Sequence, residues 1–198
     1  MDTTTIISLA VVALLLGWAV VIYNQLVALS NRYQNGFAQI EVQLKRRYDL
    51  IPNLVETTKG YLLHERETLE AVVNARNAAA SALDALGGSI NAEGIQTLSG
   101  AENALGAALG KFSVVMEAYP DLKASANVQQ LNEELASTEN RVAFARQGFN
   151  DAVMSYNTYR QSFPNLLIAN RFGHTEDAQL LEFDDSEQIQ EAPKISFT

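Results

Sequence analysis

An uninterrupted apolar run at residues 6–23, IISLAVVALLLGWAVVIY, constrains the fold of this 198-residue chain more than any other feature. No charged residue occurs between positions 3 and 31. An α-helix rises about 1.5 Å per residue, so the run would form a helix of roughly 27 Å, which matches the hydrocarbon core of a bilayer. The run therefore predicts a single-pass transmembrane anchor. Residues that mark this span are Ile6, Leu14, Gly17, Trp18 and Tyr23.

The residues on either side of the apolar run indicate whether it is cleaved as a signal peptide and which way it crosses the membrane. A cleaved signal peptide would need a basic N-terminal region, and Asp2 is the charged side chain that precedes the run. Basic residues follow the span, beginning with Arg32. Positive charge on the C-terminal side favours an N-terminus outside and a body in the cytoplasm. We therefore expect a retained anchor whose body lies on the cytoplasmic side, with the lipid bilayer as a partner.

Composition favours helices and excludes several classes of function. Hydrophobic residues make up 47% of the chain, which is enough for a core, and there are only four prolines. The absence of cysteine excludes disulfides, thiolate metal sites and a cysteine nucleophile. The net charge of −9 disfavours binding to nucleic acid, so we expect no nucleic-acid partner.

Beyond the span, apolar residues recur at alternating three- and four-residue steps, as on the buried face of a helix. The first such stripe contains Tyr33, Phe37, Ile40, Leu44 and Ile51, and it would also include Arg47 or drift to Tyr48. Proline lacks an N–H and disfavours helical geometry in the preceding residue. We therefore expect Pro52 to kink or break the helix at residues 49–52, or to begin a new helix that Asp49 caps. The helical pattern then resumes at Leu54 and continues to Leu83.

Turn residues divide the remaining chain into further helices. Gly87 and Gly88 should end the second long helix, and Asn91 can cap the third. The third helix should end or bend at Pro120.

The last long helix, from Asn127 to Phe163, carries the clearest heptad pattern, and Pro164 should stop it before a short helix at residues 165–169. Four long amphipathic helices with short turns predict an all-α fold, in which the transmembrane helix continues into an elongated antiparallel four-helix bundle. We expect a short N-terminal end at residues 1–5, the anchor with its helical extension at 6–29, the bundle at 30–173 and an acidic segment at 174–198.

The acidic segment holds seven acidic residues and one lysine. It also contains apolar residues, among them Leu180, Leu181, Phe183, Ile189, Ile195 and Phe197. That apolar content predicts that part of the segment folds against the bundle or against a neighbouring subunit.

Several polar residues are candidates for structural or binding roles. The basic run Lys45-Arg46-Arg47, which Asp49 follows, could form a patch for lipid head groups. The run lies far along the helix from the span, which favours pairing of Arg47 with a bundle carboxylate. On the last helix, Glu134 and Arg141 occupy one flank of the heptad seam, and Glu139 and Arg146 occupy the other. A polar recess inside the bundle is the alternative, lined by Asn53, Glu56, Glu139, Asn140, Arg141, Arg146, Asn150 and Asp151.

Catalytic and metal-binding patterns do not emerge from the sequence. His64-Glu65 has no second histidine at the spacing of a zinc protease, and no glycine-rich phosphate loop occurs. We therefore expect no catalytic residues, no metal and no cofactor.

Long ordered motifs in this sequence resemble the LemA family of membrane-anchored bacterial proteins. They include QLKRRYDLIPNLVETTKGY at residues 43–61, AYPDLKASAN at 118–127, LNEELASTENRVAFARQGFNDAVMSYN at 131–157 and APKISF at 192–197. The resemblance implies a place in the inner membrane of a bacterium, with a helical bundle facing the cytoplasm, and supplies no catalytic residues. Magnetosome-associated members are similar too, so the resemblance allows a role in membrane organisation. The chain departs from the family pattern at His174, where an aromatic residue often follows the glycine.

The expected function is that of a non-enzymatic, membrane-anchored scaffold that self-associates and organises membrane or partner proteins. Ala13 and Gly17 form a small-xxx-small pair that would let two spans approach closely. We therefore expect a homo-oligomer, with other membrane proteins as further partners. The alternative is a membrane-tethered sensor or adaptor that binds a ligand or peptide in the bundle.

Overall fold

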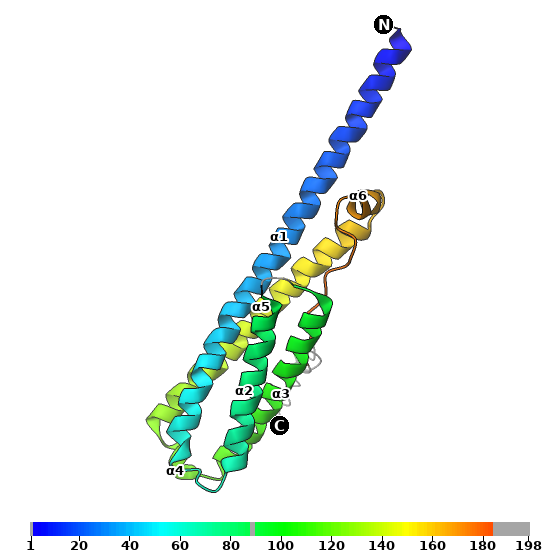
Figure 1. Cartoon of the computed structure of the whole chain (residues 1–198). Helices are drawn as coiled ribbons and strands as arrows, with labels where there is room; N and C mark the ends of the chain where they lie inside the picture. The colour runs from blue at the N-terminus through cyan, green and yellow to red at the C-terminus, as the bar shows by residue number, and fades with distance from the viewer. Residues whose placement is uncertain (1, 88–89, 184–198) are drawn as a thin grey trace, which may run out of the picture.

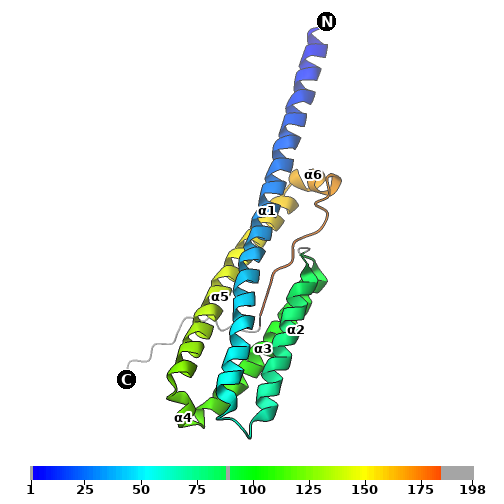
Figure 2. The ribbon, with the colours of Figure 1, turned by 60° about the vertical axis from the view of Figure 1, so that its left-hand side comes forward.

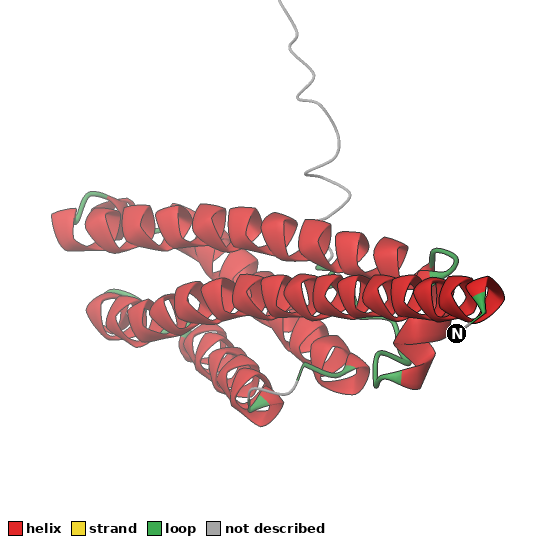
Figure 3. Ribbon diagram, turned by 90° about the horizontal axis from the view of Figure 1, so that it is seen from above, coloured by secondary structure: helices red, strands yellow, loops and turns green. Residues whose placement is uncertain are grey.

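The computed structural model describes residues 2–87 and 90–183 of the chain. Every regular element within those residues is a helix, which confirms the all-α fold class (Figure 3). The elements in chain order are α1 (Thr3–Lys59), α2 (Arg66–Leu86), α3 (Ala92–Glu117), α4 (Pro120–Lys123), α5 (Ala126–Gln161) and α6 (Asn165–Arg171).

The four long helices alternate in direction. In Figure 1, α1 descends from the N-terminus, α2 returns upward, α3 descends again and α5 rises towards α6. The body consists of two packed pairs, α1 with α5 and α2 with α3, and α1 also contacts α2. Figure 2 shows that the first part of α1 extends well beyond the other helices.

α1 has two parts with opposite surroundings. It is 57 residues long, and a helix of that size extends roughly 86 Å. Side chains from Ile6 to Val21 are exposed, apart from the half-buried Ala19, and full burial begins with Ile22 and Leu26. Among the described residues, α1 is the helix that is long and apolar enough to cross a membrane. The same helix therefore contributes both the apolar projection and a wall of the core.

The break predicted at Pro52 is wrong, because α1 continues through the proline to Lys59. Pro52 has no N–H to donate to the carbonyl of Tyr48, four residues earlier. The Nε–H of Arg76, on α2, donates to that carbonyl oxygen at 2.9 Å. The sequence predicts one helix from Leu54 to Leu83. In the structure this stretch is divided between the end of α1 and α2, with a turn at residues 60–65.

Other predicted helix ends are confirmed. Gly87 ends α2 with φ at +48°, in the left-handed region that glycine adopts without strain. Asn91 caps α3, since its side-chain oxygen accepts a hydrogen bond from the N–H of Gly94 at 2.7 Å. Pro120 begins α4 after α3 has ended at Glu117. Gly88 lies outside the described residues.

The core extends along all four long helices. Its larger cluster contains Ile40 and Leu44 of α1, Val72 of α2, Phe112 of α3 and Phe149 of α5. A smaller cluster at the upper end joins Ile22, Leu26, Tyr156 and Ala169.

Two positions define how closely the core packs and where it ends. A Cβ on Gly36 would lie 3.2 Å from the Cα of Phe149, so this glycine permits the close approach of α1 and α5. Phe163 was expected on the buried stripe of the last helix, and this prediction is wrong. Its side chain lies beyond the end of α5 and is 84% exposed.

Candidate functional site

Arg47 of α1 is buried in the helical body and is held by carboxylates from two other helices. Its Nη1 lies 2.9 Å from Oε2 of Glu102 on α3, and its Nη2 lies 3.1 Å from Oε1 of Glu139 on α5. The hydroxyl of Tyr48 donates to the second oxygen of Glu102. This Arg47 network (Arg47, Tyr48, Glu102 and Glu139) ties three helices together at one level. The predicted pairing of Arg47 with a bundle carboxylate is confirmed.

The two carboxylates of the network have different environments. The side chain of Glu102 is 1% exposed, whereas that of Glu139 is 49% exposed. Burial raises the pKa of Glu102, and the adjacent Arg47 guanidinium opposes that rise. Burial likewise raises the pKa of the Tyr48 hydroxyl, which keeps it protonated as a donor. A carboxylate as enclosed as Glu102 cannot meet a substrate, so the network holds helices in register.

Sequence reasoning identifies Arg47 and Glu139 but misses Glu102 and Tyr48. The signal for Glu102 is its place in the apolar stripe of α3, between Leu98 and Leu105. Arg47 occupies the equivalent place in the stripe of α1. Two core positions of opposite charge predict a buried ion pair, because either charge alone would be costly to desolvate.

The alternative interpretation, a polar recess inside the bundle, is wrong for the described residues. Most of its members are exposed at the surface: Asn53, Glu56, Asn140, Arg141 and Asp151. Glu139 instead reaches Arg47, and Arg146 and Asn150 face the chain that follows α6. The recess therefore does not assemble.

The remaining charged candidates form exposed contacts. Asp49 lies 3.9 Å from Nη2 of Arg76, and Glu56 lies 3.6 Å from Nζ of Lys59. Exposed pairs of this kind contribute little to stability. Arg46 lines a shallow surface recess together with Glu133, Glu134 and Arg141, among other residues.

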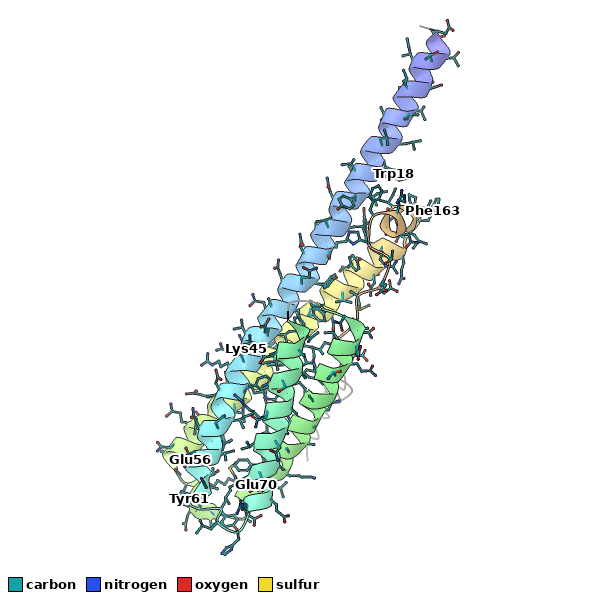
Figure 4. All side chains as sticks on the ribbon, viewed as in Figure 1. Trp18, Lys45, Glu56, Tyr61, Glu70 and Phe163 are labelled. Atoms are coloured by element: carbon teal, nitrogen blue, oxygen red, sulfur yellow. The ribbon has the colours of Figure 1, made fainter. Side chains whose placement is uncertain are left out.

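The basic run is remote from the apolar projection. Figure 4 places Lys45 well down the body, far from Trp18 along α1. The Nζ of Lys45 lies 2.6 Å from Oε1 of Glu41, one turn earlier. These positions favour pairing within the protein over contact with lipid head groups.

The segment after α6 docks on a second buried face of α5. The side-chain amide of Asn157 donates to the carbonyl of Ala178 and accepts from its N–H, at 2.9 and 2.8 Å. Asn150 bonds Leu181 in the same two-way manner, at 3.0 Å each. Leu181 is fully buried in the core.

Ionic and aromatic contacts complete this docking. Arg160 donates from Nε to Asp177 at 2.8 Å and also contacts that carboxylate through Nη2. The guanidinium of Arg146 lies 4.3 Å from the centroid of the Phe183 ring, as in a cation–π contact. Residues 174–183 are thus docked on the body, in agreement with the expectation from their apolar content. The later apolar residues Ile189, Ile195 and Phe197 lie outside the described residues.

A groove lies between α3 and α5. Its volume is about 640 Å³. The floor and walls include Leu54, Leu109, Phe112, Leu135 and Glu139. The groove is therefore apolar at its base and reaches the exposed side of the Arg47 network. Its size is within the range of ligand-binding clefts.

No group of three or more acidic or histidine side chains suited to a metal ion lies within the described part of the chain. His64 lies in the turn between α1 and α2. His174 contacts the hydroxyl of Tyr156 through Nδ1 at 3.0 Å. The two histidines therefore lie at opposite ends of the body, too far from each other to share a ligand.

The projecting apolar helix and the ion-paired helical body define a class: a membrane-associated helical protein. The sequence model of the LemA family matches residues 36–197, and the chain belongs to the LemA family. The matched region begins after the apolar part of α1 and includes the docked segment after α6.

Curated relatives come from two bacterial species. Magnetosome proteins MamQ 2 and MamQ 1 of Paramagnetospirillum magneticum and magnetosome protein MamQ of Magnetospirillum gryphiswaldense are each 26% identical to the chain over 160 residues. The alignment covers 72% of this chain and 58% of each relative. The chain therefore spans less than two thirds of the length of these relatives. None of the three is named as an enzyme.

Proposed function

We propose that this protein is a non-enzymatic scaffold, anchored in the membrane by the first part of α1, that organises membrane or partner proteins. One observation carries the proposal: α1 is at once the candidate span and a wall of the core. Ten of its residues are buried, from Ile22 to Thr58. Because no loop separates span from body, a rotation of the body would be transmitted directly to the span. A rigid connection of this kind suits the positioning of partners on a membrane.

The proposed topology is a single pass through a bacterial inner membrane, with the N-terminus outside and the body in the cytoplasm. Basic residues on the body side of the span support this orientation. Since the chain has no cysteine, single cysteines can report sidedness. In spheroplasts, a membrane-impermeant maleimide should label Thr4→Cys at once and label Asn53→Cys only after permeabilisation. The reverse pattern would exclude this orientation.

The scaffold role includes self-association. A Cβ built on Gly17 has no atom within 4 Å, so this glycine offers open backbone surface for a second span. Light scattering of the full chain in nanodiscs or detergent should show an oligomer over a wide range of concentration. Gly17→Leu should shift the distribution towards monomer. Gly148→Leu, at another open helical glycine on α5, serves as the matched control. Monomers alone at every concentration would contradict the proposal.

The groove between α3 and α5 favours a second candidate function, an adaptor that binds an extended peptide. Further along α5, residues 178–181 already bind this helix, with their backbone held by the amides of Asn150 and Asn157. A peptide continuing along the groove would meet an apolar base and the carboxylate of Glu139.

A library of synthetic extended peptides tests the adaptor function. One of them should raise the melting temperature of the full chain, and Ala136→Trp, which fills the groove, should abolish the shift. Asn140→Trp, at an exposed position of the same helix, should leave the shift intact. No shift with any peptide would count against this candidate.

A further inference from the structure

The upper end of the body exposes a group of large apolar side chains beside the projecting part of α1. They belong to α6 and its flanking turns: Phe163, Leu166, Leu167 and Phe172. Phe163 is 84% exposed and Leu167 is 61% exposed. We call these four residues the α6 collar. Apolar side chains of this size gathered on a short element mark an interaction surface.

Contacts with α1 fix the level of the α6 collar. The rings of Tyr23 and Phe172 have centroids 5.7 Å apart, and those of Tyr23 and His174 lie 6.1 Å apart. Figure 4 shows Phe163 close to the level of Trp18. Ala169, on the inner side of α6, is fully buried against Ile22 and Leu26 of α1. The collar therefore lies where α1 passes from exposed apolar surface to the buried core.

We propose that the α6 collar is a second membrane contact, which lies in the interface between lipid head groups and acyl chains on the body side of the bilayer. This proposal rests on the proposed membrane anchor and deepens it. We assign lipid as the partner of this surface because the exposed apolar side chains of the collar lie beside the exposed apolar side chains of α1. Trp18 lies near the level of Phe163, and the Tyr23 ring contacts the Phe172 ring (Figure 4). Amphipathic rings such as these prefer the membrane interface.

The polar residues of α6 fit the same placement. Arg171 is exposed and follows Leu167 by four residues, so it lies on the same side of the helix. An arginine at that position can extend its guanidinium to lipid phosphates while its alkyl stem stays in apolar surroundings. The inner residue Ile168 packs on α1 and α5, which leaves the outer residues to the bilayer.

A second contact would change how the protein meets the membrane. A single span leaves the body free to tilt and to rotate about the span axis. Contacts at α1 and at the collar together define an orientation, because two separate points on the body must stay at the same depth. The face of the body that meets the bilayer is then the end bearing α6.

Tryptophan fluorescence of the full chain in lipid vesicles tests the collar directly. The chain has one tryptophan, Trp18, which reports insertion of the anchor. Phe163→Trp in a Trp18→Phe background reports the collar. Phe144→Trp in the same background is the matched control, because Phe144 is 75% exposed but belongs to the middle of α5. Circular dichroism melting confirms that each variant is folded.

Brominated lipids should quench the Phe163→Trp variant, more with bromine near the head group than with bromine deep in the acyl chain. The Phe144→Trp variant should keep its fluorescence. Quenching of Trp18 without quenching of the Phe163→Trp variant would overturn the collar proposal and leave the anchor intact. Absence of quenching at Trp18 would overturn the anchor and the collar together.

Discussion

The Nε–H of Arg76 on α2 donates to the carbonyl oxygen of Tyr48 on α1, at 2.9 Å. That carbonyl is the one to which Pro52 cannot donate, because proline has no N–H. A side chain from a neighbouring helix thus replaces the missing backbone donor. This bond accounts for a helix that passes through a proline near its C-terminal end.

Arg76→Met should destabilise the protein by about 1–3 kcal/mol, because it keeps the stem but leaves the Tyr48 carbonyl without its donor. In a Pro52→Ala background the same change should cost less, since the alanine would supply a backbone N–H to the Tyr48 carbonyl. Chemical denaturation of the four proteins of this cycle measures the coupling. Equal costs of Arg76→Met in both backgrounds would show that the bond does not compensate for Pro52.

The Arg47 network predicts a large penalty for removing one partner. Glu102→Ala leaves a buried guanidinium with only the half-exposed Glu139, and should destabilise the protein by roughly 3–5 kcal/mol. Replacing both charges, as Arg47→Met with Glu102→Leu, should recover much of that loss, because apolar residues of similar volume need no desolvation. Unfolding free energies from denaturant titration check both results. A double variant as unstable as Glu102→Ala would refute this account.

Docking of residues 178–181 predicts a local change in hydrogen exchange. Asn150→Ala removes two hydrogen bonds to Leu181, and each such bond contributes about 1 kcal/mol. The amide of Leu181 should then exchange faster by roughly tenfold or more, since about 1.4 kcal/mol corresponds to a factor of ten. Asn53→Ala, at an exposed position of α1, is the control and should change nothing there. Unaltered exchange at Leu181 would mean that other contacts hold the segment.

His174 predicts a fall in stability at acid pH. Burial, together with Arg160, lowers the pKa of His174 below its ordinary value of 6.5. A lowered histidine pKa means that the fold favours the neutral ring, so its contribution is complete above pH 6.5 and is lost as the pH falls through the folded pKa. His174→Gln should flatten the stability curve in that range, because glutamine stays neutral and can also form a hydrogen bond with the Tyr156 hydroxyl. Melting temperatures between pH 7.5 and 5 compare the two proteins.

Glu102 also affects the dependence of stability on pH, in the opposite direction from His174. Its raised pKa means that its contribution is complete below its ordinary pKa and is lost as the pH rises through the folded value. The difference between wild type and His174→Gln isolates the histidine, because Glu102 is common to both. If the stability of His174→Gln falls at acid pH as steeply as that of the wild type, protonation of His174 does not cause the fall.

Periodicity predicts most of this fold, and the failures have physical causes. The apolar stripe of α1 and the heptad pattern of α5 identify core residues, and Asn91 and Gly87 identify two helix ends. α1 continues through Pro52 because Arg76, on a different helix, supplies a hydrogen-bond donor. The residues around a proline cannot predict a donor that comes from another helix. Phe163 continues the heptad spacing, but the helix and its packing partners end before it.

The candidate site was partly predictable for a related reason. A charge on an apolar stripe indicates a buried partner, and Arg47 fulfils that expectation. The partner itself comes from α3, at a level that depends on the turns between helices. Arg146 and Arg160 are buried because residues 174–183 cover a second face of α5. The heptad pattern predicts only one buried face, so it does not predict the burial of these two arginines.

The unbroken passage of α1 from bilayer to core is the central claim, and a distance measurement tests it most directly. Spin labels at Leu14→Cys and Asn53→Cys, in the otherwise cysteine-free full chain in nanodiscs, should give one narrow distance of roughly 58 Å by pulsed electron paramagnetic resonance, because 39 helical residues separate them. A broad distribution, or a distance much shorter than this, would show a hinge between span and body and would contradict the proposed rigid anchor.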